Sequence, residues 1–207
     1  MSNEVMTKEK VHMDPKYIME LTLKLFVTCL VVAGLLGLVN SVTEGPIADI
    51  NKAKTEEAMK AVVADPAGST FSDAMDLAAR PELTDAAVAG GGTLTEAYEV
   101  QVGGAPAGHA LKIVASGSQG NIEMMVGLDA EGAVTGVSIV DNAETAGIGS
   151  KVMENENGVL DQFIGKSAAD GELSVGKNVD AITGATVSTR GVTSGVDAAL
   201  AVAGVLG

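Results

Sequence analysis

Residues 21–39 form a long apolar run in which Lys24 is the only charged residue. A helix of about 20 mainly apolar residues crosses a bilayer, and a lysine near one end can extend its side chain to the headgroups. A cleaved signal peptide is the alternative. Against it, the polar leader at 1–20 is long, and Val39-Asn40-Ser41 is a poor match to a small-residue cleavage site. We therefore expect a retained single-pass transmembrane helix over residues 21–40.

Basic residues near the ends of such a span set its orientation. The chain has Lys8, Lys10, Lys16 and Lys24 before or at the start of the span, and Lys52, Lys54 and Lys60 farther away after it. This small excess of lysines before the span predicts that the leader, residues 1–20, is cytoplasmic and that the rest of the chain lies on the extracytoplasmic side of the cell membrane. Cys29, within the span, is expected to be a small packing residue, with a metal ligand shared with another subunit as the alternative.

Composition excludes several classes of protein. The formal net charge is −14, so nucleic acid is not an expected partner because its phosphates would be repelled. One cysteine cannot supply an internal disulfide, a thiolate zinc site or an iron–sulfur cluster from this chain alone, and the two histidines, His12 and His109, argue against a histidine-based metal site. No metal site is therefore expected.

Residues 41–93 are expected to form a helical connecting segment. Pro46 is a typical first residue of a helix, and the apolar spacing predicts that this helix ends near Ala64, before the breaker Asp65-Pro66-Ala67-Gly68. The stretch that follows is less periodic and ends in Gly90-Gly91-Gly92, which is predicted to be a flexible joint.

Residues 94–207 are expected to form the compact domain, because the apolar period changes to two. The connections between the alternating segments are short and glycine-rich, which predicts antiparallel neighbours in a meander with one covered face. A helix is predicted over 151–164 and another at the C-terminus, where Val192, Val196 and Leu200 share a face. The fold class is thus α+β, an antiparallel sheet flanked by helices. The predicted strands are Leu94–Val102, Ala110–Ala115, Ile122–Leu128 and Ala133–Val140.

The segment from Asp180 to Thr186 has a composition suited to chemistry. Gly184 and Ala185 make a slim loop that lets backbone N–H groups approach a phosphate, and Thr183 and Thr186 offer hydroxyls beside it. The alternative is an ordinary turn that ends in a helix N-cap, since serine and threonine are common caps.

A second glycine-rich loop follows the last predicted strand, over residues 141–151. Gly147 and Gly149 would permit close approach to a flat ligand, and Glu144 and Thr145 could hydrogen-bond its edge. An ordinary strand–helix loop with Ser150 as N-cap accounts for the same residues equally well.

These two loops carry a family resemblance. Asp180-x-x-Thr183-Gly184-Ala185-Thr186 resembles the flavinylation motif of the FMN-binding domain family, and Glu144-Thr145-Ala146-Gly147-Ile148-Gly149-x-Lys151 resembles its Glu-Thr-Pro-Gly-Leu-Gly signature. Gly117-x-x-Gly120-x-Ile122 fits the strand region before them. The resemblance covers about residues 20–205, and the two motifs stand in the order and at the spacing of the family.

The resemblance implies FMN linked covalently to Thr186 through a phosphoester, which would make the chain a phosphoprotein. A separate flavin transferase would supply the FMN from FAD, with Asp180 as a recognition or metal-positioning residue for that enzyme. The attached phosphate would lie near the N-terminus of the last helix, where N–H groups favour an anion. Thr183, Lys151 and Arg190 could add contacts, although both cations could equally be solvated surface residues.

The sequence also departs from the family pattern. Ala146 stands in place of the usual proline, so the turn loses a fixed φ, and Asn142 stands where a histidine is common. In this arrangement Ser188 or Thr189 is expected to cap the last helix while Thr186 carries the phosphate.

The chain shows no acid–base constellation of its own, so we interpret it as an electron carrier rather than a complete enzyme. The resemblance implies a flavoprotein subunit of an ion-translocating ferredoxin:NAD oxidoreductase (Rnf) complex, with the other membrane and peripheral subunits as partners. The alternatives are the C subunit of a sodium-pumping NADH:quinone oxidoreductase, and a standalone membrane-anchored flavoprotein of extracellular electron transfer.

Overall fold

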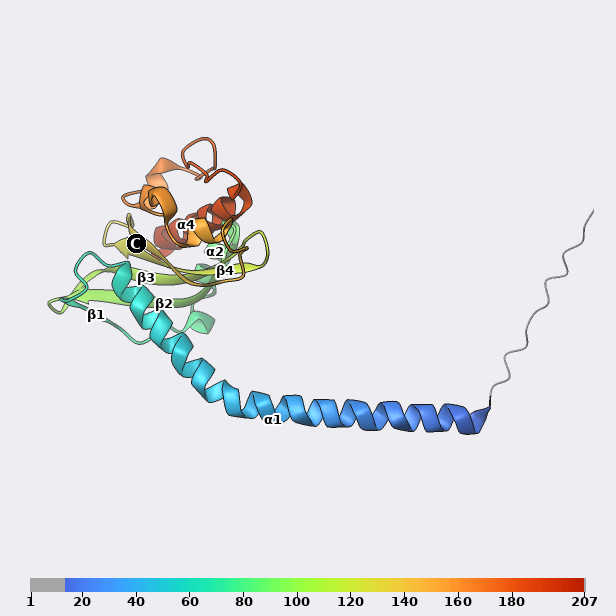
Figure 1. Ribbon diagram of the computed structural model, residues 1–207. Coiled ribbons are helices and arrows are strands. Elements are labelled where there is room, and N and C mark those ends of the chain that lie inside the picture. The colour runs from blue at the N-terminus through green and yellow to red at the C-terminus, as the bar shows by residue number, and fades with distance from the viewer. Residues whose placement is uncertain (1–13, 207) are drawn as a thin grey trace, which may run out of the picture. The chain divides into compact units, whose positions relative to one another are not determined.

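The computed structural model describes residues 14–206 of the chain (Figure 1). Residues 1–13 of the expected leader lie outside the described part. The elements follow one another as helix α1, a five-stranded sheet interrupted after its first strand by helix α2, and then helices α3 and α4. Their bounds are α1 Pro15–Ala61, β1 Ser69–Phe71, α2 Pro81–Ala89, β2 Thr93–Val102, β3 Ala105–Ser116, β4 Asn121–Asp129, β5 Val134–Asn142, α3 Ser150–Met153 and α4 Thr186–Leu206, with 3₁₀ turns at Leu77–Ala79, Glu156–Gly158, Asp161–Phe163 and Ala168–Asp170.

Helix α1 contains the predicted membrane span. It begins at Pro15, where the missing N–H of proline costs nothing, and Asp14 caps it by accepting a hydrogen bond from the N–H of Lys16 (3.0 Å). Every side chain of residues 21–40 is exposed, so this long apolar surface requires an apolar environment, and the helix is long and apolar enough to cross a membrane. The prediction that Pro46 begins a separate helix is wrong: α1 continues through it.

The chain divides into two units, residues up to Asn51 and residues from Lys52 onward. The compact unit therefore includes residues 52–93, which the sequence suggested as a connecting segment. Within that stretch, Val62, the residue that follows α1, and Leu83 of α2 are almost fully buried.

The predicted flexible joint at Gly90-Gly91-Gly92 is instead a packing site. A Cβ atom added to Gly90 would lie 2.5 Å from the Cα of Ala198 in α4. These glycines allow the end of α2 to approach the backbone of α4 closely, which a larger residue would prevent.

The sheet is a meander of five antiparallel strands in the order β1-β2-β3-β4-β5, which confirms the predicted α+β class. Gly103 and Gly104 form the two-residue turn between β2 and β3 with φ of 61° and 85°, values suited to a tight hairpin. Strand β1, which spans only Ser69–Phe71, has too few residues to show an alternating pattern.

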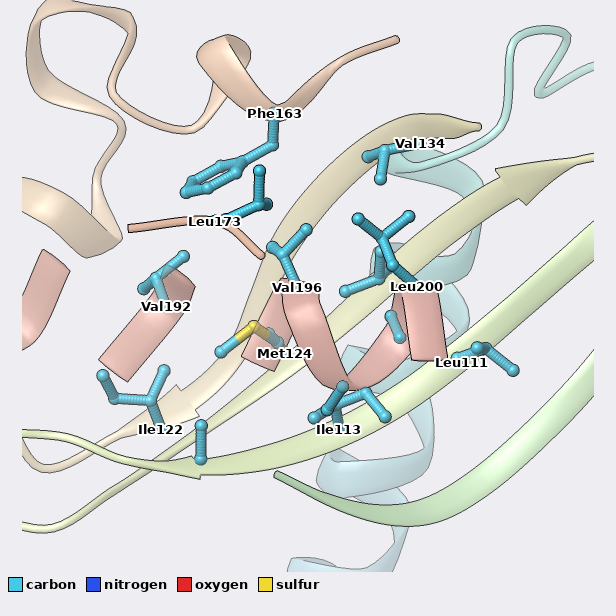
Figure 2. Packing of buried hydrophobic residues seen from close by; sticks show 14 of the residues in the cluster. Leu111, Ile113, Ile122, Met124, Val134, Phe163, Leu173, Val192, Val196 and Leu200 are labelled. Carbon is cyan, nitrogen blue, oxygen red and sulfur yellow. The ribbon is translucent and has the colours of Figure 1, made fainter. Parts of the chain in front are cut away.

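Helices α2 and α4 cover one face of this sheet (Figure 1). Val192, Val196 and Leu200 recur every four residues of α4, so they lie on one face of that helix and pack against the strands. Figure 2 shows these side chains beside Met124 of β4 and Ile113 of β3. Each such side chain, when it is fully removed from water, stabilises the folded state by about 1.5–3 kcal/mol. This packing fixes α4, and therefore its N-terminal residue, on the sheet.

The opposite face receives the C-terminal end of α1. Gly127 of β4 pairs with Gly136 of β5, and a Cβ atom on either would meet the backbone of Val62. The Oγ1 of Thr135 donates a hydrogen bond to the carbonyl of Val62 at 2.6 Å. Two paired glycines thus form a notch in the sheet that accepts the end of the helix.

The helix predicted over 151–164 is wrong. Helix α3 ends at Met153, and single 3₁₀ turns follow it. Asn155, Asn157 and Gly158 have φ of 56°, 59° and 71°, in the left-handed region, and these values cannot continue a right-handed helix. Phe163 nevertheless reaches the core and is fully buried (Figure 2).

Candidate functional site

The N-terminus of α4 presents Thr186. Gly184 has φ of 86°, a left-handed value that glycine adopts without strain, and the N–H of Ala185 donates to the carbonyl of Ile182 at 2.9 Å. The N–H of Thr189 then donates to the carbonyl of Ala185 at 2.9 Å as the first hydrogen bond of the helix. The N–H groups of residues 186–188 come before that bond and have no acceptor within the helix, which makes this end locally positive.

The expected caps of α4 have other partners. The Oγ of Ser188 donates to the Oε2 of Glu144 at 2.7 Å, and the Oγ1 of Thr189 donates to the carbonyl of Ala185 at 3.0 Å. The prediction that Ser188 or Thr189 caps the helix is therefore wrong, because both residues lie inside α4, after its first residue Thr186. The free N–H groups remain available to an acceptor from outside the helix.

Glu144 lies where three segments meet. Its Oε1 accepts hydrogen bonds from the N–H groups of Ser118 (2.6 Å) and Gln119 (3.4 Å), while its Oε2 accepts from Ser188. Gly117 and Gly149 flank the carboxylate, and a Cβ atom on either would overlap one of its oxygens. The structure thus places Glu144 between protein donors.

The loop from Thr145 to Ser150 is a compact turn. The carbonyl of Thr145 accepts hydrogen bonds from the N–H groups of Ile148 and Ser150, both at 3.2 Å, and Gly147 has φ of 76°. The Oγ of Ser150 accepts from the N–H of Gly147 at 2.9 Å, so Ser150 stabilises the turn and does not cap α3, whose first flanking residue is Gly149.

A hollow of about 160 Å³ lies between this turn and the start of α4. Thr186 is partly exposed within it, and Ile148 and Val187 are about half exposed beside it, at 52% and 53%. Two exposed aliphatic side chains next to a polar helix end suit a ligand with an anionic group and an apolar part. The lining residues are Ser118, Glu144, Thr145, Ile148, Gly149, Gly184, Ala185, Thr186, Val187 and Ser188.

A larger hollow of about 550 Å³ is lined by the preceding part of the same segment, including Asp180 and Thr183. Lys151 lines it as well, and its Nζ forms an ion pair with the Oε1 of Glu156 at 3.3 Å. Gln162 fixes the backbone here, accepting from the N–H of Asp180 (2.7 Å) and donating to its carbonyl (3.0 Å).

The structure therefore divides the predicted site residues between two hollows. Thr145, Gly149, Gly184, Ala185 and Thr186 line the smaller one, whereas Asp180, Thr183 and Lys151 line the larger. Gly147 forms the turn beside them. Arg190 is exposed on α4 and lines neither hollow.

Sequence reasoning missed several lining residues, chiefly Ser118, Gln162 and the apolar pair Ile148 and Val187. The turn that contains Ser118 is bounded by Gly117 and Gly120, and its composition indicates only a connection between strands. Ile148 and Val187 carried a usable signal, because each is an apolar residue within a polar, glycine-rich loop or next to it.

The antiparallel sheet presents a helix N-terminus whose first residue carries a hydroxyl, an arrangement suited to an anionic group such as a phosphate. In agreement, the FMN-binding domain model matches residues 117–201, which include both loops. The chain also matches the G subunit of the Na⁺-translocating ferredoxin:NAD⁺ oxidoreductase complex of Acetobacterium woodii, at 34% identity over 95% of this chain and 96% of the relative.

Other relatives carry a similar name. The G subunit of the ion-translocating oxidoreductase complex of Methanosarcina acetivorans is 27% identical over 90% of this chain and 95% of its own length. The corresponding G subunit of Aliivibrio fischeri strain MJ11 is 34% identical over 50% of this chain and 52% of its own length. The chain belongs to the G-subunit family of ion-translocating oxidoreductase (Rnf) complexes, and it contains the FMN-binding domain of that family.

Proposed function

We propose that this chain carries FMN, attached through a phosphoester to Thr186, and transfers electrons within an Rnf-type ferredoxin:NAD oxidoreductase complex that translocates ions. One observation carries the proposal: Thr186 is the first residue of α4, lies in a hollow, and is followed by N–H groups that have no acceptor in the helix. A phosphate on its hydroxyl would be held by the positive end of that helix.

The residues present fit the phosphate end of FMN. Pockets that enclose a drug-sized ligand measure roughly 300–1,000 Å³, so the hollow of about 160 Å³ suits the phosphate and adjacent polar chain rather than the whole cofactor. Ile148 and Val187 offer apolar surface at the same place. Thr145 and Gly147, in the adjacent turn, are proposed to contact the cofactor as well.

Attachment requires an activated donor. In the proposed reaction the Oγ1 of Thr186 forms a bond to the FMN phosphorus of FAD and the pyrophosphate bond to the AMP half breaks. The hydroxyl proton passes to the AMP that leaves. A flavin transferase is the proposed partner in this step. The exposed carboxylate of Asp180, with Thr183 and Lys151 in the neighbouring hollow, is proposed as the surface that this enzyme recognises.

Bound FMN supplies reversible redox chemistry, while the chain supplies its position. We propose that α1 crosses the cell membrane with its N-terminus in the cytoplasm and that the FMN-binding domain lies on the extracytoplasmic side. A covalent bond there prevents loss of the cofactor where no cytosolic FMN pool can replace it. The remaining subunits of the complex are the proposed electron-transfer partners.

The test is flavin retention under denaturing conditions. The chain co-expressed with a flavin transferase is expected to show flavin fluorescence on a denaturing gel, and Thr186→Val is expected to abolish it. Thr95→Val is the matched control, since Thr95 lies on β2 and lines neither hollow, and this variant is expected to keep the fluorescence. A wild-type band without fluorescence would refute the covalent attachment.

A further inference from the structure

The carboxylate of Glu144 joins three segments that are distant in sequence. Its two oxygens accept from the β3–β4 turn at Ser118 (2.6 Å) and from Ser188 of α4 (2.7 Å), which lies 44 residues from Glu144 along the chain. Both bonds are short, as hydrogen bonds to a carboxylate are, and such bonds are stronger than those between neutral groups. Ser188 is itself almost fully buried, at 2% exposure, so its hydroxyl has a fixed direction.

The surroundings are built to accept this carboxylate. Gly117 and Gly149 lie against its two oxygens, and an added Cβ atom at either position would displace it. Gly149 has φ of −65° and ψ of −32°, which any residue adopts, so space rather than backbone conformation requires glycine there. Ser188 lies two residues after Thr186 in the first turn of α4.

We infer that Glu144 is a positioning residue: it ties the first turn of α4 to the β3–β4 turn, and it thereby fixes the Thr186 hydroxyl in the orientation needed for FMN transfer. This inference rests on the proposed attachment at Thr186 and deepens it. Glu144 acts through Ser188 and requires no contact with the flavin. Its two oxygens are engaged by the protein before any cofactor arrives.

The first measurement uses the full chain in detergent without flavin. Glu144→Ala is expected to raise the exchange rates of the Ser118 and Thr189 amide hydrogens by roughly tenfold or more. The N–H of Ser118 loses its acceptor, and the first turn of α4, which contains the Thr189 N–H, loses the bond between Ser188 and Glu144. Glu99→Ala is the matched control. Glu99 lies on β2, its carboxylate accepts from Gln101, and its removal is expected to leave both amides unchanged.

The second measurement is the rate of FMN transfer from FAD by purified flavin transferase. Glu144→Ala and Ser188→Ala are each expected to lower kcat by roughly tenfold with little change in KM for FAD, and the double variant is expected to be no slower than Glu144→Ala. Glu144→Gln should recover much of the rate, because its amide offers an acceptor to Ser118 and a donor to the Ser188 oxygen.

The outcomes separate the two claims. Faster exchange with an unchanged transfer rate would show that Glu144 is only structural and overturn the inference, as would additive effects of the two substitutions. Exchange and transfer both at wild-type values would overturn it as well. A wild-type chain that accepts no FMN would instead overturn the proposed function, and the positioning role with it, whatever the exchange rates show.

Discussion

The two glycines of the Glu144 loop are predicted to serve different purposes, and alanine substitutions separate them. Gly147 has φ of 76°, and a Cβ atom added there would meet nothing within 4 Å in the described part of the chain. Gly147→Ala is therefore expected to lower the free energy of unfolding only through backbone strain, by roughly 1–2 kcal/mol. Gly149 has a right-handed backbone, where alanine would otherwise stabilise the fold by about 0.4–1 kcal/mol.

At Gly149 the cost comes from space. A Cβ atom would lie 2.9 Å from both the Cβ of Glu144 and the Oγ of Ser188. Overpacking of this kind costs about 1–3 kcal/mol, and subtraction of the backbone gain leaves a net loss of about 1.3 kcal/mol at the midpoints of the two ranges. Both variants are therefore expected to unfold at temperatures lowered by a similar amount, about 2–4 °C per kcal/mol for a unit of this size.

FMN transfer distinguishes the variants. Gly149→Ala displaces Glu144 from Ser188, so it is expected to slow attachment of FMN to Thr186 strongly. Gly147→Ala is expected to slow it less, because a Cβ atom at Gly147 would touch neither Glu144 nor Ser188. Circular dichroism melts of the full chain give the stability, and timed flavin fluorescence on denaturing gels gives the rate. Equal slowing in both variants, or wild-type stability and rate in Gly149→Ala, would refute this reasoning.

Three further predictions concern stability. Phe163→Ala removes a fully buried side chain and is expected to cost about 3–5 kcal/mol in denaturant titration; a loss below about 1 kcal/mol would contradict its place in the core. Thr135→Val removes the hydrogen bond to the Val62 carbonyl and is expected to cost about 1–3 kcal/mol, while an unchanged denaturation midpoint would argue against the glycine notch. Burial raises the pKa of Asp197, despite the hydrogen bond from the N–H of Leu173, so the folded chain binds this proton more tightly than the unfolded chain does. Its contribution to stability is expected to decline as pH rises above the ordinary aspartate pKa of about 3.9, and Asp197→Asn is expected to remove that decline; parallel pH profiles for the two chains would contradict it.

The sheet was predictable because alternation is a strong signal when one face of a strand is covered. The predicted strand Ile122–Leu128 lies within β4, Asn121–Asp129, and the glycine-rich turns gave the antiparallel order. Helix α2 was missed although Pro81 and Glu82 are typical of a first helical turn. Its nine residues lie in a stretch with little periodicity.

The error over residues 151–164 has a physical cause. Val152, Val159 and Phe163 have the spacing of a helix face, and all three are buried, so the pattern identified the core residues correctly. It could not show that Asn155 and Asn157 adopt left-handed conformations, because asparagine tolerates both hands of backbone. In this segment the apolar spacing indicates which residues are buried, but it does not indicate a helix.

The site was predictable at the level of its two loops but not of their contacts. The sequence motif pointed to Thr186, and the structure places it in a hollow at the start of α4. The bond between Glu144 and Ser188 depends on how α4 packs on the sheet, which no local pattern records. For the same reason, the separation of Asp180 and Thr183 from Thr186 into two hollows appeared only in three dimensions.

The mass of the intact mature chain is the decisive measurement for covalent FMN on Thr186. We expect a chain heavier by one FMN less one water, with the added mass located by fragmentation on the peptide that contains Thr186. Thr186→Val is expected to have the mass of its unmodified sequence. A mature wild-type chain with the mass of its unmodified sequence, or with FMN attached to a different residue, would contradict the account.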